Sequence, residues 1–103
     1  MEITVEELSA KLASGAPVHL LDVREPEEFA LTQLEGAQLI PLGELQARAD
    51  EIPAEVEVVV YCHHGIRSLQ AVGLLRAQGR AAMSLKGGID AWSRRIDPSV
   101  PRY

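Results

Sequence analysis

Hydrophobic positions along this chain follow two alternating patterns. Short, nearly continuous apolar runs are typical of strands buried on both faces of a sheet, and they occupy residues 18–23, 39–40, 56–61 and 81–85. Between these runs, apolar residues recur at helical spacing, which predicts helices over residues 5–12, 24–29, 42–52, 69–79 and 89–96. Strands that alternate with helices predict an α/β fold in which helices flank a central, mostly parallel sheet.

Local signals mark the ends of several predicted helices. Thr4 and Glu7 have the spacing of a capping box, in which each side chain bonds to the other residue's backbone amide, and Gly15 is a suitable stop. Pro26 falls in the first turn of the next helix, where its missing N–H costs nothing, and Pro53 ends the helix before the strongest strand. The tail over residues 97–103 contains two prolines and is predicted to be extended.

Length and composition indicate one ordinary globular domain over residues 1–103. Hydrophobic residues make up 47% of the chain and charged residues 24%, which excludes a disordered or collagen-like protein. No apolar stretch approaches the roughly 18 residues of a membrane span, and the first residues lack the basic start of a signal peptide. The single cysteine, Cys62, excludes an internal disulfide, so we expect a cytoplasmic protein.

Charge is distributed unevenly along the chain. The net charge of −5 argues against general nucleic-acid binding. Residues 1–61 carry 13 acidic and three basic side chains, whereas residues 62–103 carry two acidic and seven basic ones. The basic part therefore begins at Cys62.

The segment around Cys62 carries the clearest candidate chemistry. Cys62 directly follows the β-branched strand 56–61, and ligands of open α/β sheets bind beyond the carboxyl ends of the strands. Gly65 permits a left-handed turn that aims successive backbone N–H groups inward. The following helix adds its positive end. Both effects favour a thiolate, so Cys62 is predicted to be a nucleophile.

The rest of this segment is predicted to bind the substrate. Arg67, five positions after Cys62, offers a permanent charge and a fork of donors to an anion. Histidines titrate close to neutral pH, so His63 and His64 are expected to set the charge of the pocket rim. No metal site is expected, since three adjacent residues of one tight loop rarely converge on one ion. The predicted binding loop comprises His63, His64, Gly65, Ile66, Arg67 and Ser68.

Four motifs in order resemble the rhodanese family of single-domain sulfurtransferases over nearly the whole chain. They are LLDVREPEEF at residues 20–29, GA with IPL at 36–42, CHHGIRS at 62–68 and LKGGIDAW at 85–92. One departure is TQLE at residues 32–35, where the family typically has Gly-His-Ile-Pro. The resemblance implies a rhodanese-like three-layer fold.

The resemblance also implies a mechanism without a cofactor. Cys62 would take the outer sulfur of thiosulfate or of a donor persulfide, hold it as a covalent persulfide, and pass it to a thiophilic acceptor. Arg67 would steer the anionic donor and stabilise the departing charge.

Asp22 and Arg24 are expected to support the fold rather than to react, and His19 is expected to be a hydrogen-bonded core histidine.

Two other functions compete with sulfur transfer. A cysteine-dependent phosphatase of related fold has a loop one residue longer between Cys and Arg, and an arsenate reductase needs a second thiol, which this chain lacks. A binding or regulatory module with the same fold would act without chemistry, but inactive relatives usually lose the cysteine that is present here.

The tail extends the resemblance to possible partners. Residues 96–103, IDPSVPRY, are similar to the end of rhodanese domains fused to adenylating enzymes of sulfur-carrier pathways. This implies a sulfur-carrier protein, an adenylating enzyme or a cysteine desulfurase as a partner in trans, without nucleic acid or membrane. The other interpretation of the tail is a proline-stiffened strap packed on the surface.

Overall fold

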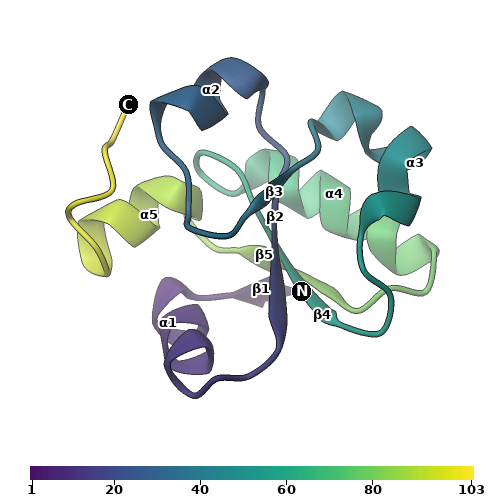
Figure 1. The fold of residues 1–103 in the computed structure, drawn as a ribbon, viewed down its shortest axis with the longest axis horizontal. Helices are drawn as coiled ribbons and strands as arrows, with labels where there is room; N and C mark the ends of the chain where they lie inside the picture. Colours follow the sequence, from purple (N-terminus) through teal and green to yellow (C-terminus); the bar gives the residue numbers. More distant parts are fainter.

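Five parallel strands form the centre of the molecule (Figure 1). In the computed structural model, which describes residues 1–103, their order across the sheet is β1-β5-β4-β2-β3. The strands are β1 (Glu2–Ile3), β2 (Val18–Asp22), β3 (Gln38–Leu39), β4 (Glu57–Tyr61) and β5 (Ala82–Leu85). The helices are α1 (Val5–Ala13), α2 (Pro26–Leu31), α3 (Leu45–Arg48), α4 (Ile66–Ala77) and α5 (Gly88–Arg95). The predicted α/β fold with a parallel sheet is confirmed.

The central strand β4 is buried on both faces, as its apolar run predicts. Val58 and Val60 belong to one hydrophobic cluster, which includes side chains from α3 and α4. Val59 and Tyr61 point to the other face, into a cluster with side chains from α1 and α5. Helices therefore cover both faces of the sheet and make three layers (Figure 1).

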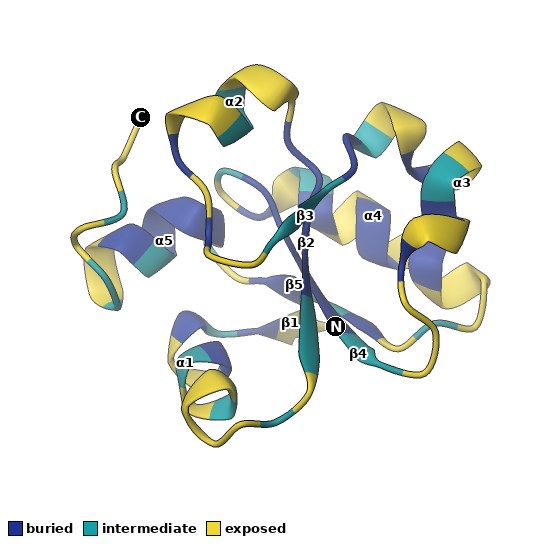
Figure 2. Ribbon diagram, viewed as in Figure 1, coloured by how far each residue is buried: buried dark blue, intermediate teal, exposed yellow.

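Helix α2 differs from the others because it contains no buried residue. It follows β2 and lies at the carboxyl edge of the sheet, with mostly exposed residues along its length (Figure 2). Polar contacts rather than apolar packing must therefore fix its position.

None of the helices of the molecule has the length and apolar character needed to cross a membrane.

Several details differ from the sequence predictions, including a turn from Asp97 to Val100 in the tail, which is predicted to be extended. Strand β1 was not predicted, because two residues with one apolar side chain show no periodicity. The helix predicted over residues 42–52 is split into α3 and two flanking 3₁₀ turns. Helix α4 begins at Ile66, three residues before the predicted start at Leu69. The apolar pattern does not predict this first turn, because Ile66 is exposed and lies outside the apolar stripe. His19 is hydrogen-bonded, with Nε2 2.7 Å from Gln38 Oε1, but it is only half-buried.

Candidate active site

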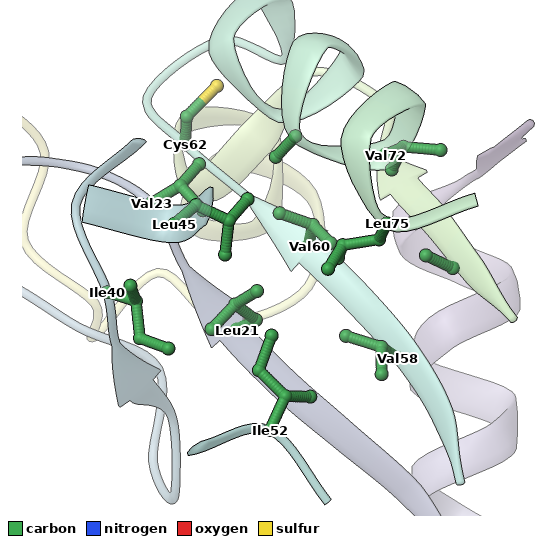
Figure 3. Packing of buried hydrophobic residues seen from close by; sticks show 12 residues of the cluster. Leu21, Val23, Ile40, Leu45, Ile52, Val58, Val60, Cys62, Val72 and Leu75 are labelled. Carbon is green, nitrogen blue, oxygen red and sulfur yellow. The ribbon is translucent and has the colours of Figure 1, made fainter. Parts of the chain in front are cut away.

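Cys62 lies immediately after β4, at the carboxyl edge of the sheet, where the sequence placed it. The residue is 1% exposed and belongs to the cluster that packs between the sheet and α4. Its side chain lies at the margin of that cluster, with the sulfur pointing away from Val23 and Leu45 (Figure 3). The sulfur is thus shielded by protein but sits at the end of the core rather than inside it.

Two backbone amides point at the sulfur. The N–H groups of Gly65 and Ser68 donate to Cys62 Sγ, with N–S distances of 3.1 and 3.4 Å. Ser68 Oγ lies 3.5 Å from the sulfur and 2.7 Å from Ser84 Oγ, and both serines are fully buried. The expected amide cradle is therefore made by two of the loop amides, with a pair of buried hydroxyl groups behind it.

Gly65 produces this cradle by its backbone conformation. Its φ of 107° is left-handed, and it is the N-cap of α4, a conformation that favours glycine. A Cβ atom at this position would lie 3.2 Å from the backbone nitrogen of Gly87. The turn at Gly65 starts α4 directly beside the sulfur, so the positive end of the helix faces it.

A second helix holds the loop from its other side. The backbone amides of Ile89 and Asp90, in the first turn of α5, donate to the carbonyl oxygens of Cys62 and His63 at 3.0 and 3.2 Å. Gly88, with φ of 63°, permits this approach. A Cβ atom on Gly88 would lie 2.5 Å from the Cys62 carbonyl oxygen. The paired glycines therefore allow the β5–α5 turn to pack directly on the loop that follows Cys62.

Gly88→Ala is expected to lower the free energy of unfolding by about 2–4 kcal/mol, because it combines left-handed strain with a clash against backbone. Denaturant unfolding measures this effect. Gly73→Ala is the matched control, since Gly73 is helical and a Cβ there meets nothing within 4 Å. The control should be neutral or slightly stabilising. A loss below about 1 kcal/mol for Gly88→Ala would show that the loop can move aside.

Arg67 lies in the first turn of α4, and its guanidinium is held by a carboxylate. Nη1 and Nη2 donate to Oε1 and Oε2 of Glu28 at 2.7 and 3.0 Å. Glu28 comes from α2, so this ion pair joins α2 to the start of α4. Hydrogen bonds from Arg67 lower the pKa of Glu28 to about 2, despite partial burial. The predicted substrate-binding arginine is therefore near the site, but its charge is already paired.

His63 and His64 form an aromatic stack with the tail. Their ring centroids are 3.9 Å apart, and the ring of Tyr103 lies 3.9 Å from His63 on a nearly parallel plane. Desolvation, followed by the charge of His64, lowers the pKa of His63 below its usual value. This shift favours the uncharged form of His63 at neutral pH. The tail is packed over the loop by this stack.

One set of side chains near the loop resembles a metal-ligand set. Ligand atoms of His63, His64 and Asp90 lie within 4.8 Å of one another. However, the two carboxylate oxygens of Asp90 already accept from Arg94 and Arg102, each at 3.0 Å. The two imidazole rings are also stacked, with their planes 30° apart, so their nitrogen lone pairs do not point toward one position between them. A cation would have to displace both arginines and separate the rings, so this set fits a metal poorly.

Asp22 and Arg24 form a fully buried ion pair where β2 ends. Arg24 Nη2 lies 2.6 Å from Asp22 Oδ2, and both side chains are 0% exposed. Arg24 also donates to the carbonyl oxygen of Thr32 at 2.6 Å and to the Tyr103 hydroxyl at 2.9 Å. Burial lowers the pKa of Arg24, but the bonds with Asp22 and Tyr103 outweigh it and raise the pKa above its ordinary value. The pair ties β2 to the segment after α2, in keeping with the supporting role predicted for it.

Sequence reasoning missed three residues that contact the predicted site. The sequence places Glu28 in the motif at residues 20–29, Tyr103 in the tail and Ser84 in the apolar run at residues 81–85, and it gives no sign of these contacts. Each meets the loop or Arg67 through contacts between distant parts of the chain. Only Glu28 has a sequence feature that could have indicated such a contact, because it is a charged residue inside a family motif.

The largest cavity lies elsewhere. Its volume is about 520 Å³, and residues 53–57 and 78–81 line it. These residues precede β4 and β5, so the cavity opens at the amino edge of the sheet. Parallel α/β sheets bind ligands at the opposite edge, which is where Cys62 lies.

Comparison with known proteins identifies the class to which this fold and site belong. A model of the rhodanese-like domain matches residues 4–95. A rhodanese-related protein from Thermoplasma volcanium has the same fold, with a TM-score of 0.87, 28% identity, and coverage of 99% of this chain and 98% of that one. The chain therefore belongs to the rhodanese-like family.

The relatives include proteins with sulfurtransferase in their names. A sulfurtransferase of Allochromatium vinosum is 41% identical over 100 residues, which cover 96% of this chain and 94% of the relative. The probable adenylyltransferase/sulfurtransferase MoeZ of Mycobacterium tuberculosis is 36% identical over 104 residues. This match covers 98% of the present chain but only 26% of MoeZ, so most of that protein has no counterpart here.

Proposed function

We propose that this protein is a sulfurtransferase in which Cys62 carries the transferred sulfur as a persulfide. The observation that carries the proposal is the position of Cys62 Sγ at the end of β4, where the amides of Gly65 and Ser68 donate to it. Amide donors and a helix N-terminus stabilise negative charge on a sulfur atom. Similarity to proteins named as sulfurtransferases supports the same reaction.

The first half of the reaction loads the cysteine. The Cys62 thiolate attacks the outer sulfur of thiosulfate and forms a new S–S bond. The original S–S bond breaks, and sulfite leaves with its electron pair. The product is a Cys62 persulfide anion, so charge is conserved, and the loop amides are placed to donate to it. A donor persulfide would react in the same way and release a thiolate.

The second half transfers the sulfur to another molecule. A nucleophilic acceptor attacks the outer sulfur of the persulfide, and the Cys62 thiolate leaves with the electron pair of the broken S–S bond. Cys62 is the only cysteine of the chain, so no second thiol can resolve the persulfide as an internal disulfide. The acceptor must therefore come from outside the chain, and no metal or organic cofactor is needed.

The donors and partners are part of this proposal. Thiosulfate or a small persulfide is the donor class, and a sulfur-carrier protein, adenylating enzyme or cysteine desulfurase is the class of protein partner. The similarity to MoeZ, which joins both named activities in one chain, supports such a partner. A reducing compartment such as the cytoplasm would keep Cys62 available as a thiol.

Phosphatase or arsenate reductase chemistry is less compatible with this site. Cys62 and Arg67 are separated by five positions, a loop one residue tighter than that of the related phosphatases. In addition, Glu28 binds the terminal nitrogens of Arg67 that a tetrahedral oxyanion would require. A non-catalytic binding module is the remaining alternative, and the test below separates it from the enzyme.

The proposed function predicts stoichiometric loading of the protein with sulfur. After incubation with thiosulfate, the intact mass should increase by one sulfur atom, and a peptide containing Cys62 should carry the increment. Addition of cyanide should then release thiocyanate and restore the original mass. If thiosulfate produces neither the increment nor thiocyanate above the protein-free rate, the binding-module interpretation is favoured.

A further inference from the structure

The positive charge of Arg67, which belongs to the loop of the predicted nucleophile, is neutralised within the protein. Both terminal nitrogens of Arg67 are bound by the carboxylate of Glu28, at 2.7 and 3.0 Å. The Arg67 side chain remains 35% exposed and the Glu28 side chain 19% exposed. The pair is thus accessible to a ligand, but the fork of Arg67 that would receive a bidentate anion is occupied.

Two further hydrogen bonds, besides those from Arg67, hold the Glu28 carboxylate in this position. The backbone amide of Glu25 donates to Glu28 Oε1 at 3.0 Å, and the Tyr103 hydroxyl donates to Oε2 at 2.7 Å. Tyr103 is itself held by its stack on His63 and by a hydrogen bond from Arg24. With a pKa near 2, Glu28 is a carboxylate at neutral pH. It is therefore a permanent negative charge with a defined place beside the active loop.

This arrangement determines the charge that a sulfur donor meets. The Cys62 thiolate and the Glu28 carboxylate are two negative charges, and Arg67, which is paired with Glu28, supplies one positive charge. The lowered pKa of His63 favours its uncharged form at neutral pH. The other carboxylate near the loop, Asp90, is paired with Arg94 and Arg102. The Asp90 group therefore carries one net positive charge, but Glu28 cancels the charge of Arg67, the arginine of the Cys62 loop itself.

We propose that Glu28 is a specificity-determining residue that favours sulfur donors with one negative charge over the dianion thiosulfate. The inference rests on the proposed sulfurtransferase function and adds the class of donor. Persulfide and thiosulfonate anions carry one charge, so Glu28 repels them less than it repels thiosulfate. Tyr103 acts as a positioning residue, because its hydroxyl holds the Glu28 carboxylate toward Arg67.

Two donors of similar shape test the inference, namely thiosulfate and methanethiosulfonate. Each gives its outer sulfur to Cys62, and the leaving groups are sulfite and methanesulfinate, respectively. Glu28→Gln should raise kcat/KM for thiosulfate about tenfold more than kcat/KM for methanethiosulfonate, because one negative charge is removed and a dianion senses it twice as strongly. This change in the ratio of the two kcat/KM values should be smaller in high salt.

Two further variants keep the test specific. Glu27→Gln removes the same charge from an exposed neighbour that takes part in none of the ion pairs, and it should change the donor ratio less than about twofold. Tyr103→Phe keeps the aromatic ring but loses the hydroxyl, so it should shift the ratio about two- to threefold in the direction of Glu28→Gln. This second variant also answers the question if Glu28→Gln folds poorly.

The outcomes separate the inference from the function on which it rests. An unchanged donor ratio in Glu28→Gln and Tyr103→Phe, with sulfur transfer intact, would overturn the role of Glu28 alone. An equal loss with both donors would show that Glu28 only supports the structure. A shift of the same size in Glu27→Gln would assign the effect to overall charge. If neither donor loads Cys62 in the unaltered protein, the proposed function itself fails.

Discussion

Cys62→Ser is expected to lower sulfur transfer from thiosulfate to cyanide by at least about a thousandfold, because the variant loses the covalent intermediate. A serine hydroxyl does not ionise at neutral pH, and an oxygen nucleophile cannot form the persulfide. No other side chain can replace it, since the chain contains no second cysteine. The measurement is the initial rate of thiocyanate formation under donor-saturating conditions.

The interpretation of this loss requires that the fold be preserved. Cys62 is buried and serine is of similar size, so unfolding in denaturant should show only a modest loss of stability, about 1–2 kcal/mol. Lys86→Gln is a suitable comparison, because it alters an exposed residue of the neighbouring β5–α5 turn and leaves the nucleophile in place. If Cys62→Ser retained more than about a tenth of the rate, the persulfide mechanism would be wrong.

Much of the fold follows from local sequence signals. β4 could be predicted because Val58, Val59 and Val60 are buried on alternate faces, and this leaves a continuous apolar run. The capping box at Thr4 and Glu7 also forms as predicted. Strand β1 could not be predicted in this way, because its pairing with β5 depends on backbone hydrogen bonds that have no periodic side-chain signal.

The candidate site also has one part that local sequence patterns predict and another part that they do not. The turn at Gly65 and the placement of Cys62 after β4 are local consequences of the sequence, and both were predicted. The pairing of Arg67 with Glu28 links residues 39 positions apart, and no local pattern reports such a contact. As a result, Arg67 was predicted to offer a free charge to a substrate, whereas the structure shows that this charge is balanced.

One network of hydrogen bonds joins the candidate site to the buried ion pair of Asp22 and Arg24. Arg24 is bonded to Asp22 in the interior and to the Tyr103 hydroxyl toward the surface, at 2.6 and 2.9 Å. The same hydroxyl donates to Glu28, which binds Arg67. Because α2 buries no side chain of its own, this chain of bonds positions it against the loop that follows Cys62. A change at Arg24 should therefore affect both stability and the geometry of Arg67.

Arg24→Met should lower the free energy of unfolding by about 3–5 kcal/mol, because it leaves the Asp22 carboxylate buried without its partner. Asp22 is 0% exposed, and the arginine supplies both side-chain donors to it. A loss of this size is a large part of the total stability of about 5–15 kcal/mol typical of a domain. Equilibrium unfolding in urea measures it directly.

Two further variants determine whether the buried charge causes this loss. Arg48→Met removes an arginine that pairs with Glu44 and Glu51 on the surface, and it should cost less than about 1 kcal/mol. Adding Asp22→Asn to Arg24→Met removes the unpaired charge but keeps an oxygen that can accept from the Arg24 backbone amide, a bond of 2.9 Å in this structure. The double variant should therefore be more stable than Arg24→Met by about 1–3 kcal/mol. If it is less stable instead, the interior at this position requires the carboxylate itself, and the cost of Arg24→Met comes from the lost bonds to Thr32 and Tyr103 rather than from an unpaired charge.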